Sequence, residues 1–261
     1  MKKLALTSLL AVFAFTGAHA ANVIDGNPLY LPGAGHFYSV TSVGSHTGSG
    51  PIKYWGAEEE FGYGVTDKLS VAVTTSVAEE DTFDAYAWED LSLQAAYRAL
   101  DMGAWKLDLV GAYGLTPVWG YHAPFLDKTT TNYAWIAGVR GGYTTANWTL
   151  AGHVYFSYLN TESFNWGDEG MHTWVLGLDG QYLIDSHWGV LAGVEYTGFT
   201  DSYAKNDGAW EATLGVNYNI DATKFVGAYV SADMNHHGGD HADEWEVENG
   251  FGFGAKFGID F

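Results

Sequence analysis

The stretch that decides the fold is Gly250-Phe251-Gly252-Phe253-Gly254-Ala255-Lys256-Phe257-Gly258-Ile259-Asp260-Phe261, at the end of the sequence. Its odd-numbered positions carry rings and alkyl groups, and its even-numbered positions carry glycine and charge. Because successive side chains of a strand point to opposite faces, this stretch predicts a strand with one apolar face. Such a strand would aggregate in water, whereas in lipid its apolar face suits the wall of a barrel.

The same alternation recurs upstream in segments that bring the total to about twelve strands. Short connections alternate with longer polar ones, which is typical of an up-and-down antiparallel barrel. We therefore predict an all-β fold, a single transmembrane barrel of about 12 strands, with 10 or 14 as alternatives. The short connections are expected at 66–68, 101–104, 144–147, 185–187 and 221–224, and the long ones near 79–87, 117–131, 160–172, 199–208 and 233–246, with a shorter one near 45–51.

Rings flank the short connections. Amphipathic rings prefer the level of lipid headgroups, so this placement predicts an aromatic belt. A secreted β-sandwich would also alternate, but it gives no reason for rings on both sides of four of the five short turns. The rings before the turns are Tyr97, Tyr143, Tyr182 and Tyr218, and those after them are Trp105, Trp148, Trp188 and Phe225.

Taken together, the alternating strands, the unequal connections and the final aromatic strand resemble Gram-negative outer-membrane β-barrels of the porin-like class, without matching one named family. The resemblance implies that Phe257, Ile259 and Phe261 form an assembly signal read by the barrel assembly machinery. It also implies contacts with outer-membrane lipid and lipopolysaccharide. An even number of strands places both termini on the periplasmic side.

The N-terminal residues predict export. Lys2 and Lys3 precede an apolar stretch too short to span a membrane, and Ala18-His19-Ala20 fits a signal-peptidase site. We expect residues 1–20 to be a signal peptide, 21–35 a periplasmic leader or a plug in the lumen, and 36–261 the barrel. The sequence has no cysteine, so an exported barrel must be stable without disulfides.

Charge excludes one class of partner. The chain has a net charge of −20, which argues against nucleic acid as a partner because nucleic-acid binding needs a basic surface. An acidic surface instead suits divalent cations or small cationic solutes.

The inward parity of the strands predicts the lumen. Two interpretations remain open: small residues leave a cation-preferring channel for passive diffusion of small solutes, or Arg98, Lys106 and Arg140 pair with acids and close the interior. In the second case the barrel is a structural or surface-interaction protein with acidic loops that contact ions or lipopolysaccharide. The residues expected to line the lumen and set selectivity are Glu58, Glu60, Asp90, Arg98, Lys106, Arg140, Glu195 and Glu211.

The last long connection offers a third hypothesis, a metal-capturing barrel. Histidine and acidic residues are close together in its sequence, and imidazole and carboxylate groups suit a divalent metal at the 233–246 loop. Otherwise no cofactor is expected. The candidate ligands are His236, His237, Asp240, His241 and Asp243.

The chain is not expected to be an enzyme. His153 and Ser157 share a face, but about 13 Å of strand separates them, which is too far for a hydrogen bond. No other combination of residues suggests a catalytic set.

Overall fold

The computed structural model describes residues 26–47, 54–80, 85–118, 130–159, 171–199, 206–237 and 249–261. Within these ranges every regular element is a strand, and no helix is long and apolar enough to cross a membrane. The strands are β1 (Phe37–Thr47), β2 (Tyr54–Thr66), β3 (Leu69–Glu80), β4 (Ala85–Met102), β5 (Trp105–Val118), β6 (Thr130–Thr144), β7 (Trp148–Leu159), β8 (Met171–Leu183), β9 (Trp188–Phe199), β10 (Asn206–Asp221), β11 (Lys224–His237) and β12 (Gly250–Asp260).

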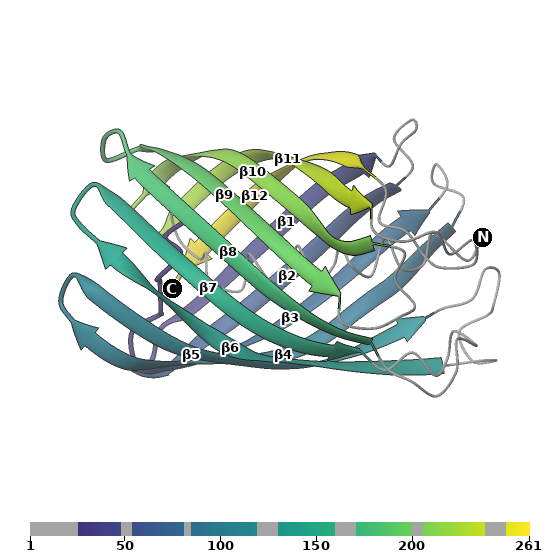
Figure 1. The fold of residues 1–261 in the computed structure, drawn as a ribbon. Coiled ribbons are helices and arrows are strands. Elements are labelled where there is room, and N and C mark those ends of the chain that lie inside the picture. Colours follow the sequence, from purple (N-terminus) through teal and green to yellow (C-terminus); the bar gives the residue numbers. More distant parts are fainter. Residues whose placement is uncertain are drawn as a thin grey trace.

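These strands close into one barrel in which each pairs with its sequence neighbours and β1 pairs with β12 (Figure 1). All pairings are antiparallel, and the closing pair aligns Tyr38 with Asp260 and Thr47 with Phe251. The main chain also joins the two ends, because the Phe37 and Phe261 amides and carbonyl oxygens bond each other at 2.8 and 2.9 Å. The predicted all-β, closed antiparallel barrel of twelve strands is therefore confirmed.

The short connections all lie at the end of the barrel that holds Phe261 (Figure 1). Several are shaped by side chains: the Asp185 carboxylate accepts the main-chain N–H groups of His187 and Trp188 at 2.7 and 2.8 Å. Most connections at the other end are longer, but strands extend further into them than predicted. The predicted 79–87 connection is reduced to 81–84, because β3 continues to Glu80 and β4 begins at Ala85.

The outer face of the barrel is apolar. Leu93, Leu178 and Leu214 are 58%, 48% and 56% exposed, although a soluble domain would bury such side chains. Six of the eight rings that flank the short turns are also exposed, among them Trp105 and Tyr182. These observations agree with the predicted outward parity in strand after strand.

Phe225 is an exception to the predicted aromatic belt. Its side chain is 1% exposed and points inward, where it covers Gly258 of β12. The exposed outward residue at this position of β11 is Val226. The prediction failed because the alternation in β11 is weak, so its parity could not be assigned from sequence.

Inward glycines hold rings from neighbouring strands. The ring of Tyr38 lies where a Cβ atom at Gly62 would sit, His153 does the same at Gly177, and Tyr229 does so at Gly254. Small inward residues were expected to leave open space for a channel. Much of that space is instead filled by side chains from adjacent strands, so the lumen is narrower than glycine content suggests.

Candidate functional site

The interior carries a cluster of three charged residues on β4, β5 and β6. The guanidinium of Arg98 donates to both carboxylate oxygens of Asp108, at 2.7 and 3.1 Å, and Arg140 Nε donates to Oδ2 at 2.9 Å. Asp108 is fully buried. A carboxylate without solvent is stable only when its charge is matched and its oxygens are bonded, and two guanidinium groups meet both needs.

The same two arginines hold the segment that precedes the barrel. Arg98 Nη2 donates to the main-chain oxygen of Leu29 at 2.6 Å, and Arg140 Nη2 donates to that of Tyr30 at 3.1 Å. Leu29 is 1% exposed, and the hydroxyl of Tyr30 donates to Asp260 at 3.2 Å. We call residues 26–32 the inner segment, because these contacts place it against the inner wall.

A second network lies on β1 to β4. The hydroxyl of Tyr38 donates to Glu60 at 2.9 Å, and Glu60 is 5% exposed. Thr74 contacts the other oxygen of Glu60 at 3.5 Å, and the Gln94 amide donates to Thr74 at 2.9 Å. Glu60 is the one carboxylic acid in this network. The four side chains bond one another across adjacent strands, so they occupy this part of the lumen.

A third network joins β7, β8 and β9. His153 Nδ1 lies 3.1 Å from Asp179 Oδ2, and Nε2 lies 3.1 Å from Glu195 Oε2. The imidazole also stacks on Tyr155, with ring centroids 4.7 Å apart. Because ionised carboxylates only accept hydrogen bonds, a protonated imidazole that donates from both nitrogens satisfies both of them.

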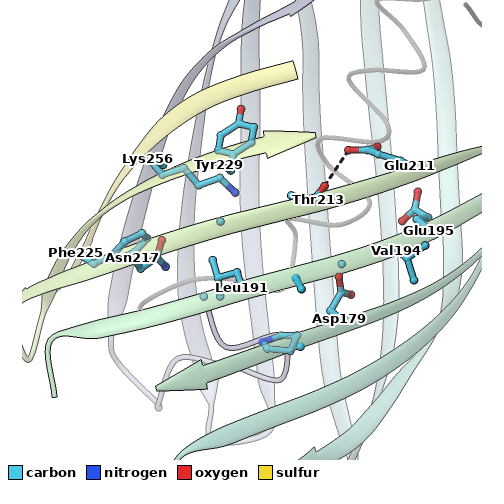
Figure 2. Close-up of a pocket in the computed structure, with 17 residues that line it drawn as sticks. Asp179, Leu191, Val194, Glu195, Glu211, Thr213, Asn217, Phe225, Tyr229 and Lys256 are labelled. Carbon is cyan, nitrogen blue, oxygen red and sulfur yellow. Dashed lines mark hydrogen bonds between the residues drawn. The ribbon is translucent and has the colours of Figure 1, made fainter. Parts of the chain in front are cut away.

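Next to this network lies a cavity, partly open to solvent, between the inner segment and β8 to β12 (Figure 2). Its apolar side includes Pro28, Leu191 and Phe225. Its polar side brings together the carboxylates of Asp179, Glu195 and Glu211 with the ammonium of Lys256. A concave site with apolar walls and a few charged groups is the usual form of a small-molecule site.

Some of the inward carboxylates lie further from the short turns than the arginines do. Arg98 and Arg140 lie four residues from the short-turn ends of β4 and β6 at Met102 and Thr144. Glu211 lies ten residues from the end of β10 at Asp221. Six residues of a strand tilted by about 40° rise about 15 Å, so a solute from the long-connection end meets carboxylates before arginines.

The structure groups some of the predicted lumen residues and separates others. Arg98 and Arg140 both pair with Asp108. The interpretation in which arginine and lysine pair with acids and close the interior expected this of Arg98, Lys106 and Arg140. Glu60, Glu195 and Glu211 face the lumen in different networks. Glu58 and Lys106 are half-buried, and only the main chain of Asp90 is described.

The metal hypothesis falls largely outside the described residues. His236 and His237 lie in β11 with only their main chains described, while Asp240, His241 and Asp243 are not described. Among the parts of the chain that are described, no group of three or more histidine, aspartate or glutamate side chains is arranged to hold a metal. Metal binding at the last loop stays a prediction, as does the signal peptide at residues 1–20.

Sequence reasoning did not select several residues that matter here. Asp108, His153, Asp179 and Lys256 all have inward parity, which is a signal they share with the residues that were selected. The sequence does not show which of these residues contact one another, because partners such as His153 and Glu195 are 42 residues apart. Tyr229 was missed because the parity of β11 was uncertain.

No family model and no curated protein matches this sequence. Solved structures do match. An outer membrane channel from Pseudomonas putida F1 aligns with a TM-score of 0.57 and 17% identity, over 89% of this chain and 97% of that one. The NanC porin aligns with a TM-score of 0.56 and 12% identity, over 84% and 98%.

The translocator domain of the autotransporter NalP from Neisseria meningitidis aligns with a TM-score of 0.59 and 15% identity, over 98% of this chain and 97% of that domain. At these identities the likeness is one of fold. This chain therefore has the fold of outer-membrane β-barrels, a class that includes porins and channels.

Proposed function

We propose that this chain is an outer-membrane channel for small solutes that prefers cations and is narrowed at its short-turn end by the inner segment. One observation carries the proposal: the closed barrel exposes large apolar side chains outward and turns charged groups inward. Val77 is 51% exposed on the outside, whereas Arg140 is 2% exposed on the inside. In a membrane this distribution satisfies both hydrocarbon and water, and a closed ring leaves no strand edge unpaired.

Cation preference is supported by the charges that remain after pairing. Asp108 is matched by two arginines, and His153 lies between Asp179 and Glu195. Lys256, four residues from the short-turn end of β12 at Asp260, interacts electrostatically with Glu58, Glu60 and Glu211, which lie further from that end. The part of the lumen nearer the long connections is therefore acidic, and an acidic pore lining favours cations over anions.

The inner segment supports a restricted channel. It lies against the inner wall and is bonded to Arg98 and Arg140 through main-chain oxygens. Both bonds are accepted by main-chain oxygens, so they depend on the backbone position of the segment and not on the identity of its side chains. A closed barrel, the runner-up function, would follow if the segment fills the lumen permanently.

Catalysis is not part of the proposal. Ser157, the nucleophile considered in the sequence, is hydrogen-bonded to Thr173. His153, its potential base, is occupied by two carboxylates. The two residues are therefore held apart in separate interactions.

Planar-bilayer recording tests the proposal. Purified protein is added to one side of a bilayer with a tenfold KCl gradient, and current steps and the reversal potential are measured. We expect discrete steps and a reversal potential with the sign of K⁺ selectivity. A current no larger than that of detergent alone, or selectivity for chloride, would contradict the proposal.

A further inference from the structure

We propose that the cavity between the inner segment and β8 to β12 is a binding site for small organic cations that carry a primary ammonium on a short alkyl chain. The inference deepens the proposed function, because it names a class of solute, and it rests on that function only in requiring that the lumen admit solutes. It follows from the chemistry of the cavity and from the side chain that already extends into it.

Lys256 indicates which chemistry the cavity accepts. It lines the cavity from β12, and its ammonium lies 5.0 Å from the centroid of the Tyr229 ring (Figure 2). The same ammonium interacts electrostatically with Glu58, Glu60 and Glu211. A primary ammonium on a four-carbon chain thus lies beside an aromatic face and within the field of several carboxylates, a combination that favours alkylammonium ligands.

Glu211 retains capacity for a further cation. Its carboxylate accepts one hydrogen bond of 3.3 Å, from the hydroxyl of Thr213 to Oε1, and among the described residues Oε2 has no hydrogen-bond donor. In Figure 2 Glu211, Glu195 and Asp179 lie along one side of the cavity. Asp233 and Glu195 add negative charge beside Glu211. A half-bonded carboxylate among other carboxylates favours a cationic donor.

The apolar part of the cavity favours an organic cation over a bare metal ion. Leu191, Pro28 and Phe225 line it together with the acids. A metal ion gains nothing from these groups and loses hydration, whereas an alkyl chain gains from contact with them. Because the cavity is partly open to solvent, a short alkylammonium can enter it from the lumen.

Calorimetry in detergent tests the site independently of ion current. The probe is cadaverine, a five-carbon chain with two ammonium groups, and the control ligand is glutarate, a five-carbon chain with two carboxylates. We expect saturable heat for cadaverine and none for glutarate. Equal heats for the two ligands, or none for either, would overturn the proposal.

Two substitutions should change cadaverine binding in opposite directions. Glu211→Gln removes one ligand carboxylate and is expected to weaken binding about tenfold, whereas Lys256→Met removes the internal competitor and is expected to strengthen it about tenfold. The matched control is Glu59→Gln, since Glu59 lies on the outer face and its hydrogen bonds come from Ser39 and Thr41. Equal weakening in Glu59→Gln and Glu211→Gln, or weaker binding in Lys256→Met, would contradict the assignment.

The outcomes separate this inference from the proposed channel. Cation-selective current without cadaverine heat would remove the binding site and leave the channel intact. Cadaverine heat with the expected response of both lumen variants, but without ion current, would leave the binding site intact and remove the channel. A heat-dependent gel shift of every variant confirms that the barrel has closed before either measurement.

Discussion

The guanidinium of Arg98 donates a hydrogen bond of 2.6 Å to the main-chain oxygen of Leu29, a residue 69 positions earlier in the chain. This contact joins the inner segment to the wall of the barrel at its short-turn end. Because the same guanidinium also bonds Asp108, one side chain both balances a buried charge and positions the segment. The proposed restriction of the channel depends on this double role.

Removing the inner segment should widen the channel. If residues 26–32 are deleted, Arg98 and Arg140 lose the main-chain oxygens of Leu29 and Tyr30, and the freed space fills with water. We expect single-channel conductance to rise several-fold with the cation preference retained. The measurement is planar-bilayer recording of both proteins, and an unchanged conductance would show that the segment does not restrict the pore.

Asp108 should be essential for stability. Asp108→Asn leaves Arg98 and Arg140 without a buried counter-charge, which typically costs about 3–5 kcal/mol. Urea unfolding in lipid vesicles measures the change in the free energy of unfolding. Asp101→Asn is the control, because Asp101 is exposed in the same hairpin and its capping oxygen is retained; we expect a change below about 0.5 kcal/mol there. Equal effects of the two substitutions would refute the role given to Asp108.

Glu59 is a carboxylate on the apolar outer face. On that face of β2 it lies two residues from Phe61 and four from Trp55, which is about 7 and 13 Å along the strand. Ser39 and Thr41 donate to its two oxygens, each at 2.5 Å. These hydroxyls therefore replace the water that the carboxylate would otherwise need.

Removing those hydroxyls should leave the Glu59 carboxylate without hydrogen-bond donors on the lipid-facing side. We expect Ser39→Ala with Thr41→Val to destabilise the barrel in vesicles by about 1–3 kcal/mol for each hydrogen bond lost. Adding Glu59→Leu should restore the lost free energy of unfolding, because position 59 then carries no polar group that needs a hydrogen bond. If the triple variant is as unstable as the double variant, the hydroxyls do not act through Glu59.

Asp185 should make the β8–β9 turn sensitive to acid. The N–H groups of His187 and Trp188 bond its carboxylate and lower its pKa below the ordinary value. A lowered pKa in the folded state means that the contribution to stability is complete above the unfolded pKa of about 3.9 and is lost as the pH falls through the folded value. We expect Asp185→Ala to be less stable than the wild type at pH 7 and equal to it at low pH, as measured by urea unfolding. If the two proteins still differed in free energy of unfolding at low pH, the ionised carboxylate of Asp185 would not be the source of the stability.

Much of the fold could be predicted because the alternation of apolar and small or polar residues within a strand shows which residues face outward. In β12 alternate residues such as Phe257 and Gly258 differ so strongly that the outward face is evident from sequence alone. Turn positions were predictable for a similar reason, since Asp185 and Asp221 are local signals. Phe225 shows the limit: β11 has apolar residues on both faces, so local pattern gives two answers and only pairing with Gly258 decides between them.

The lumen could be predicted only as a set of inward residues. Whether Arg98 lies beside Asp108 or beside Glu60 depends on register between strands, which no local pattern specifies. The same holds for the inner segment, whose proline-bounded sequence was equally consistent with a leader outside the barrel. Pairing across the barrel is a property of the closed ring, and for that reason it required coordinates.

The central claim is that hydrocarbon touches the outer face and water touches the inner one. Because the chain has no cysteine, single spin labels can be attached at Leu214→Cys, which points outward, and at Thr213→Cys, which points inward. In vesicles we expect the label at 214 to collide mainly with oxygen, which concentrates in hydrocarbon, and the label at 213 to collide mainly with a water-soluble nickel chelate. Equal accessibility of the two labels, or the reverse order, would contradict the account.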